Sequence, residues 1–178
     1  MREYAFENNH EVNLSRLKGP FIPKDEYSYI HENTIRVCHD VFIEYQGGIL
    51  FVLRKDLPVR GIPWVLGGGI RRGVPIEDSL RMKAREECGL ELENIKELGF
   101  ARTFFETDPF GHGKGTDTLN FVYFAQGKGE LKLNDDHYNP FILTSDKYTP
   151  EFKESLHPYI KDFMDMAMLC LKSLTLDN

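Results

Sequence analysis

A run of three glycines that leads into a short helix ending on two glutamates is the part of this sequence that most clearly indicates chemistry. The glycines are Gly67, Gly68 and Gly69, and the glutamates are Glu86 and Glu87. Backbone amides that glycine leaves accessible can face phosphate oxygens, and neighbouring carboxylates can hold Mg²⁺ or Mn²⁺. The pattern therefore predicts a diphosphate on the amides of Gly68 and Gly69, beside a divalent metal held by Glu86 and Glu87.

Two arginines and one histidine are further candidates for the same site. Arg71 and Arg72 follow the glycines and could neutralise a diphosphate through bidentate contacts, although two solvated loop arginines would look the same in sequence. His137 follows Asp135 and Asp136 and could act as a general base or a third ligand; an exposed acidic turn is the alternative. The sequence leaves both alternatives open.

A glycine-containing segment and three aromatic residues complete the candidates. His112 and Lys114 lie in residues 107–116, which read either as a mobile lid over a substrate or as a loop tip. The aromatic side chains could stack on a nucleobase, but such residues more often belong to the core. They are Trp64, Phe104 and Phe105.

The pattern of apolar residues predicts the elements that position these side chains. A helix should start near Pro75 and end at Cys88, with Gly89 as its C-cap. An amphipathic helix is expected over residues 158–174 and a short helix over 23–32. Strands are expected over residues 35–45, 49–54, 64–66, 98–106, 119–126 and 141–144, the first two forming a hairpin. Strands on both sides of one central helix suit a mixed sheet between helices.

Composition limits the class of protein. The chain has 178 residues, of which 41% are hydrophobic and 28% charged, enough for one globular domain with a core. A net charge of −6 argues against nucleic acid as a general partner, which would need a basic face. Cys38, Cys88 and Cys170 form no C-x-x-C pair, so neither a zinc site nor a disulfide framework is indicated. The lack of an apolar leader or membrane-length run favours a reducing cytoplasm and no membrane partner.

The glycines and glutamates together resemble the Nudix box, whose pattern reads G-x5-E-x7-R-E-U-x-E-E-x-G-U, where U is a bulky apolar residue. Aligned backwards from Gly89, the first glycine of the pattern falls on Gly68 and its adjacent glutamates fall on Glu86 and Glu87. The resemblance implies an α/β fold, the Nudix-type α-β-α sandwich with a mixed central sheet. It also implies a divalent-metal-dependent hydrolase acting on a nucleoside diphosphate linked to another moiety.

Three positions depart from that pattern. Its first glutamate falls on Val74, its arginine on Met82, and the glutamate after the arginine on Lys83. Lys83 lies one helical turn before both box glutamates, where its ammonium can pair with either of them. One interpretation is that Lys83 partly replaces the metal, because hard cations need oxygen ligands. The other is an ordinary surface ion pair of small energetic value.

Stretches beyond the box resemble the GDP-mannose mannosyl hydrolase branch of the family, over residues 26–146. The likeness rests on Glu26-Tyr27, Arg36-Val37, Asp40-Val41-Phe42, Pro63-Trp64-Val65-Leu66 with the three glycines, Gly115-Thr116-Asp117-Thr118 and Asp135-Asp136-His137-Tyr138. That branch lacks some box carboxylates and attacks the sugar carbon rather than phosphorus. It activates water with a histidine in the last of these segments, which implies that role for His137.

Two functions stay open at this point. The first is a hydrolase of a nucleotide sugar such as GDP-mannose, in which His137 or a nearby carboxylate such as Glu87 activates water. The second is a Nudix-like domain that has lost catalysis and binds a nucleotide or a partner protein, which Val74, Met82 and Lys83 favour. In either case residues 1–22 are expected to be an N-terminal arm and residues 23–178 a single domain. The helices near the two ends are expected to form a homodimer.

Overall fold

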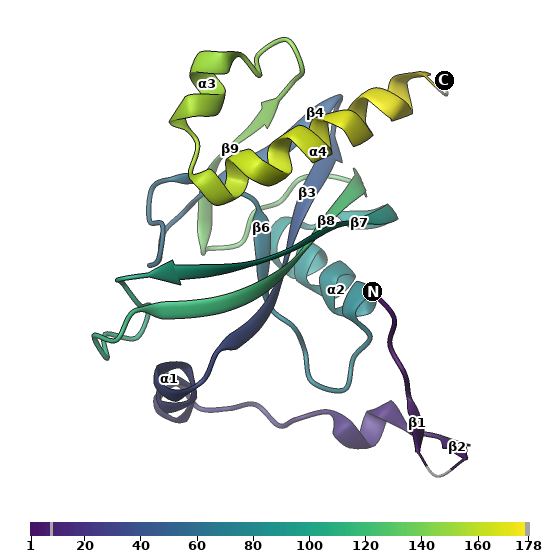
Figure 1. The fold of residues 1–178 in the computed structure, drawn as a ribbon, viewed down its shortest axis with the longest axis vertical. Helices are drawn as coiled ribbons and strands as arrows, with labels where there is room; N and C mark the ends of the chain where they lie inside the picture. Colours follow the sequence, from purple (N-terminus) through teal and green to yellow (C-terminus); the bar gives the residue numbers. More distant parts are fainter. Residues whose placement is uncertain (8, 177–178) are drawn as a thin grey trace.

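The computed structural model describes residues 1–7 and 9–176, which form a seven-stranded sheet between helices (Figure 1). The strands of this sheet are β3 (Arg36–Tyr45), β4 (Gly48–Arg54), β5 (Pro63–Trp64), β6 (Leu66–Gly69), β7 (Glu91–Phe105), β8 (Thr116–Lys128) and β9 (His137–Leu143). The helices are α1 (Lys24–Asn33), α2 (Ile76–Cys88), α3 (Pro150–Ser155) and α4 (Pro158–Leu176). A small hairpin of β1 (Phe6–Glu7) and β2 (His10–Glu11) and the 3₁₀ turn η1 (Leu14–Leu17) precede them.

The sheet is mixed, as the sequence predicts. Its strand order is β5-β4-β3-β8-β7, with β6 paired to β3 and β9 paired to β4. The β3–β4 hairpin turns at Gln46 and Gly47, whose φ angles of 51° and 84° suit a tight turn that matches the strand twist. The strand β3 runs antiparallel to β4 and parallel to β8, so it holds the centre of the sheet.

Helices α2 and α4 cover opposite faces of the sheet (Figure 1). Successive strand residues point to opposite faces, and the central strands accordingly feed two hydrophobic cores. Phe42 and Phe51 pack in the core that includes Met164 of α4, whereas Leu50 packs in the core that includes Leu80 of α2. The α-β-α sandwich predicted from the sequence is therefore confirmed.

The helix α2 lies almost where the sequence predicts it. It ends at Cys88, and Gly89 follows in the left-handed conformation with φ of 72°, its amide donating to the Arg85 carbonyl at 3.1 Å. At the other end, the Glu3 carboxylate accepts the Ile76 amide at 3.1 Å. A carboxylate at a helix N-terminus is favourable against the helix dipole. The N-terminal arm is thus attached to the start of the helix that carries the box glutamates.

The sequence predicts a strand only as far as residue 66, but the strand continues through the three glycines. Residues 66–69 form β6, which pairs antiparallel with β3 so that Gly67 lies beside Asp40 and Gly69 beside Cys38. Glycine is a weak strand former, so packing rather than propensity must account for this strand.

Other boundaries differ by smaller amounts. The strand β9 begins at His137 because residues from there on pair with β4, whereas the sequence predicts a strand only from residue 141. The short helix α3 was not predicted, although Thr149 caps it by accepting from the Phe152 amide at 3.2 Å. The predicted C-terminal helix is confirmed as α4. Within the part of the chain that the structure describes, no helix is long and apolar enough to cross a membrane.

The strand β7 is the outermost strand of the sheet and is longer than predicted, with 15 residues. Its pairing with β8 is interrupted twice, between Glu93 and Lys96 and between Glu97 and Gly99. Such bulges bend a strand and increase its twist.

Candidate functional site

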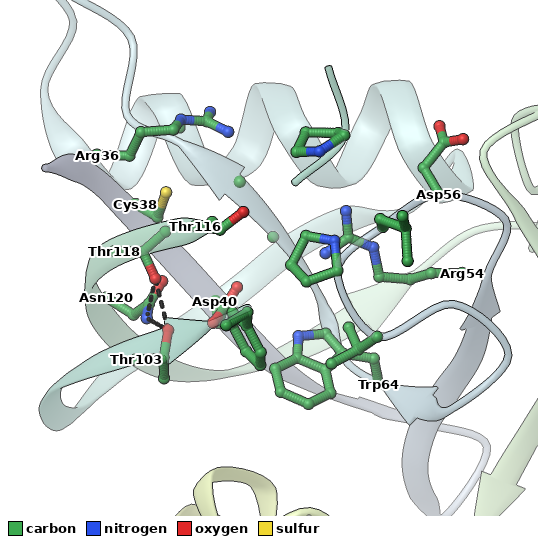
Figure 2. Close-up of a pocket in the computed structure, with 18 of the residues that line it drawn as sticks. Arg36, Cys38, Asp40, Arg54, Asp56, Trp64, Thr103, Thr116, Thr118 and Asn120 are labelled. Atoms are coloured by element: carbon green, nitrogen blue, oxygen red, sulfur yellow. Dashed lines mark hydrogen bonds between the residues drawn. The ribbon is translucent and has the colours of Figure 1, made fainter. Parts of the chain in front are cut away.

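A cavity of about 260 Å³ lies where β3, β6 and β8 meet the end of α2 and the loop after β4 (Figure 2). Charged side chains line it: the cations Arg36, Arg54 and Lys83, and the acids Asp40, Asp56, Glu87 and Asp136. In Figure 2 the guanidinium groups of Arg36 and Arg54 reach in from opposite sides. A concave site with both signs of charge suits a polar, anionic ligand.

Glu87 and Lys83 form an ion pair at one side of this cavity. They are one turn apart on α2, with Lys83 Nζ 2.7 Å from Glu87 Oε1. Glu87 is buried, and its second oxygen, Oε2, has no hydrogen-bond partner. Burial raises the pKa of Glu87, while Lys83, Arg54 and the Gly67 amide oppose the rise. Because Glu87 is buried and belongs to the cavity, the pair is not an ordinary surface ion pair.

The three glycines make room for the charged side chains of the cavity. A Cβ at any of them would lie within 3 Å of one such group: Asp40 Oδ1 at 2.0 Å for Gly67, Lys83 Cε at 2.8 Å for Gly68, and an Arg36 guanidinium nitrogen at 2.7 Å for Gly69. Gly68 also has a φ of 151°, which side chains rarely adopt. The strand β6 is glycine-only at these positions because its neighbours on β3 and α2 pack directly onto its backbone.

Asp40 links the cavity to the C-terminal helix. Its Oδ2 accepts a hydrogen bond from the Tyr159 hydroxyl at 2.5 Å. Burial raises the pKa of Asp40 to about 6, against the lowering effects of Tyr159 and Arg54. The Tyr159 ring stacks on Trp64 with centroids 5.5 Å apart. The indole and the phenol ring together form an aromatic support behind the acid.

His137 is held as a neutral imidazole with a defined tautomer. Its Nδ1 lies 3.1 Å from Asn134 Oδ1, an atom that also accepts the Asp136 amide at 3.1 Å. The Asn134 amide nitrogen donates to the Asp136 carboxylate at 3.0 Å, which fixes which end of the amide faces the ring. The imidazole must therefore donate from Nδ1, leaving Nε2 as its proton acceptor. Burial and the nearby Arg54 charge lower the pKa of His137 to about 4.

The segment that carries His137 is attached to the end of α2. The amide of Lys132 donates to the Cys88 carbonyl and the amide of Asn134 to the Glu87 carbonyl, both at 2.9 Å. These bonds satisfy two carbonyls that a helix end would otherwise leave free. They also fix His137 in the same cavity as Glu87.

Sequence analysis missed a polar wall formed by β7 and β8. Thr103 and Thr118 join their hydroxyls at 2.6 Å, and the Asn120 amide donates to both, at 3.2 and 2.9 Å (Figure 2). All three line the cavity and are buried. The signal was present, because Thr116, Thr118 and Asn120 are two residues apart along β8 and must share one face of the strand.

The two box glutamates point in different directions. Glu86 is exposed, lies outside the cavity lining, and pairs with the Arg71 guanidinium at 2.6 Å. Arg72 is also exposed and lies outside the lining. The structure thus brings Gly68, Gly69, Glu87 and His137 together and leaves Glu86, Arg71 and Arg72 apart from them.

The segment 107–115 is docked on α1 by hydrogen bonds and an ion pair, and its Pro109 lines the cavity. Asp108 accepts the amides of residues 110–113, and His112 Nε2 lies 2.7 Å from His31 Nδ1. Lys114 pairs with Glu32 of α1 at 2.7 Å. His31, rather than His112, reaches the cavity.

The aromatic candidates divide in a similar way. Trp64 and Phe105 line the cavity and contact each other edge to face, with centroids 6.2 Å apart. Phe104 is exposed and lies under the Arg102 guanidinium, 4.8 Å from it.

The donor set of this cavity does not fit a resident divalent ion. Mg²⁺ and Mn²⁺ prefer several oxygen ligands. Among residues 1–7 and 9–176 there is no group of three His, Cys, Asp or Glu side chains placed to hold a metal. Of the two predicted ligands, Glu86 binds Arg71 and Glu87 binds Lys83. Asp40 is engaged by Tyr159.

The fold and the box together define a Nudix domain, and the chain belongs to the Nudix family, whose domain model matches residues 34–161. It is 30% identical over 146 residues to the low-salt glycan biosynthesis protein Agl8 of Haloferax volcanii, covering 81% of this chain and 89% of that protein. It is 32% identical over 108 residues to an ADP-ribose pyrophosphatase of Methanocaldococcus jannaschii, covering 61% of this chain and 59% of that enzyme.

A solved structure supports the fold. A MutT Nudix hydrolase from Burkholderia pseudomallei superposes with a TM-score of 0.54 at 24% identity, covering 69% of this chain and 96% of that one. Nudix hydrolases act on a nucleoside diphosphate linked to another moiety and typically use a divalent metal.

Proposed function

We propose that this chain hydrolyses a nucleoside diphosphate linked to a sugar, a nucleotide sugar such as GDP-mannose. The observation that carries the proposal is a neutral His137 with a free acceptor nitrogen in a cavity that also holds Arg36, Arg54 and Lys83. A general base and a cluster of cations are what hydrolysis of a diphosphate linkage requires. The role in glycan biosynthesis that the name of the Haloferax relative states is consistent with a sugar-linked substrate.

The residues divide the work by their chemistry. The two arginines and Lys83 bind the diphosphate oxygens and stabilise the charge that grows on the leaving group. The hydroxyls of Thr103 and Thr118 and the Asn120 amide offer donors and acceptors suited to sugar hydroxyls. Trp64, which also lines the cavity, supplies apolar surface for a ring.

His137 serves as the general base. Its Nε2 accepts a proton from water, while the Nδ1 proton stays on the ring and keeps its hydrogen bond to Asn134 Oδ1. The imidazolium that forms is stabilised by Asp136 nearby. The low pKa keeps the base unprotonated at neutral pH. Glu87 remains a further candidate for this role, because one of its oxygens is buried without a partner.

A second candidate function follows from the Lys83–Glu87 ion pair. An ammonium that neutralises the one buried box glutamate would suit a domain that binds a nucleotide without hydrolysing it. In this second function the fold and the cavity are the same, but the bound nucleotide is not hydrolysed. Binding without product release, from folded protein, would favour it over the hydrolase.

The experiment is a screen of purified protein against nucleotide sugars, ADP-ribose, dinucleotides and nucleoside triphosphates, with Mg²⁺, with Mn²⁺ and with EDTA. Released phosphate and released sugar are followed separately, because free sugar without phosphate would indicate attack at carbon. His137→Gln should lower kcat by about 10²- to 10⁴-fold. His10→Gln, in the exposed strand β2, is the matched control. Equal turnover by His137→Gln and wild type would reject the assigned base.

We also propose a homodimer through α1 and α4. Tyr29 and Ile30 of α1, and Leu169 of α4, are exposed apolar side chains on these helices. A monomeric mass by light scattering at micromolar protein would reject the dimer.

A further inference from the structure

We infer that Lys83 takes the place of a resident divalent ion beside Glu87, so that the cavity binds a diphosphate through built-in cations alone. The diphosphate part of this inference rests on the proposed function. The replacement of the metal stands on the geometry of the site.

Lys83 is held where its ammonium faces the cavity. Its Nζ lies 2.7 Å from Glu87 Oε1, and its terminal carbon lies against Gly68, where any Cβ would come within 2.8 Å. The lysine side chain is 30% exposed, whereas the Glu87 side chain is only 6% exposed. The ammonium is thus fixed between α2 and β6, with its remaining protons available to a ligand in the cavity.

A divalent ion at Glu87 would meet this ammonium. The only carboxylate oxygen of Glu87 left for it is Oε2, on the same carboxyl group that binds Lys83. Two cations on one carboxylate repel each other strongly where water is scarce. Within the described residues, no group of three His, Cys, Asp or Glu side chains is placed to bind the ion and offset this repulsion.

The two arginines of the cavity, unlike Lys83, form no direct ion pair with a carboxylate in the part of the chain that the structure describes. Arg36 and Arg54 take part in none of the ion pairs within residues 1–7 and 9–176, and both guanidinium groups reach into the cavity. Arg36 is oriented by the Tyr27 ring, 5.2 Å from its guanidinium. Guanidinium groups directed into a hollow without a carboxylate partner indicate an anionic ligand. Together with Lys83, they give a diphosphate three cationic contacts.

The test measures the binding of Mn²⁺ alone, without nucleotide. Binding is detected as the loss of the free-ion signal in electron paramagnetic resonance. Wild type should bind no Mn²⁺ at this site. Lys83→Glu puts a second carboxylate one turn before Glu87 and should create Mn²⁺ binding. Arg85→Glu is the matched control: it makes the same charge change on the same helix, but Arg85 pairs with Glu91 outside the cavity. It should gain no binding.

A second measurement keeps the inference testable if Lys83→Glu does not fold. The affinity of wild type for GDP, measured by calorimetry, should be the same in Mg²⁺ and in EDTA. Lys83→Met should weaken it by about tenfold or more, the loss of one charge-assisted contact.

The outcomes separate this inference from the proposed function. Mn²⁺ binding by wild type alone, or GDP binding that disappears in EDTA, would overturn the replacement of the metal. If Mn²⁺ binds only to Lys83→Glu and GDP binds to neither protein, the replacement stands and the nucleotide function is rejected.

Discussion

The hydrogen bond from Tyr159 to Asp40 gives a prediction that can be worked out in detail. Tyr159→Phe keeps the ring that stacks on Trp64 and removes only the hydroxyl that donates to Asp40 at 2.5 Å. A hydrogen bond to a charged group is worth about 1.5–3 kcal/mol, whereas one between neutral groups is worth about 1 kcal/mol. The cost of the substitution therefore depends on whether Asp40 is charged.

The sign of that dependence follows from the pKa. Burial raises the pKa of Asp40 in the folded protein to about 6, above its ordinary value of 3.8. The folded state then holds the proton more tightly, and Asp40 makes stability fall as pH rises between these values. Loss of the Tyr159 hydroxyl raises this pKa further. Tyr159→Phe should therefore cost about 1 kcal/mol near pH 5 and about 3 kcal/mol near pH 8.

Urea unfolding of wild type and variant at the two pH values measures the difference directly. Tyr148→Phe serves as the control, because its hydroxyl also donates to a carboxylate, at 2.9 Å, but Asp165 is exposed. That control should change stability by less than about 0.5 kcal/mol at either pH. An equal loss at both pH values for Tyr159→Phe would refute the assignment of a buried, titrating Asp40.

Three further predictions concern stability. Gly67→Ala should destabilise by about 3 kcal/mol in urea unfolding, because its Cβ would lie 2.0 Å from Asp40 Oδ1 and 2.5 Å from the backbone oxygen of His39. Glu3→Ala should cost about 1 kcal/mol, with faster amide exchange at the start of α2, because the Ile76 amide loses its carboxylate acceptor. Unchanged exchange there would argue against the cap. His39 is fully buried, and burial lowers its pKa from 6.5 to about 4. Its contribution to stability is therefore complete above pH 6.5, and about 3 kcal/mol is lost as the pH falls from 6.5 to 4, because only the unfolded chain then binds the proton. A His39→Gln variant with the same acid profile as wild type would contradict this.

Much of the fold could be predicted from local sequence patterns. The helix α2 and its cap at Gly89 were predictable because helical periodicity and a left-handed glycine are properties of neighbouring residues. The strands were found in the same way, but their ends were not. Where β9 begins depends on its pairing with β4, which no local pattern records.

The site was only partly predictable, and for identifiable reasons. The glycines 67–69 were recognised as unusual, yet their role is to accommodate side chains from β3 and α2, a relation that exists only in the folded chain. Neighbouring helix residues point 100° apart, but which of Glu86 and Glu87 faces the cavity depends on their partners Arg71 and Lys83, which only the folded chain shows. Arg54 carries no motif and could be assigned to the site only from the structure.

The bulged strand β7 has a consequence for the behaviour of the protein at high concentration. A free sheet edge offers amides and carbonyls on which another molecule can add a strand, and a long, flat edge is a template for aggregation. In β7 the two interruptions fall close together, beside Glu93, Lys96 and Glu97. The edge is divided into shorter, twisted stretches flanked by charge. A strand as long as β7 can therefore form the edge of the sheet without acting as a template for strand addition by a second chain.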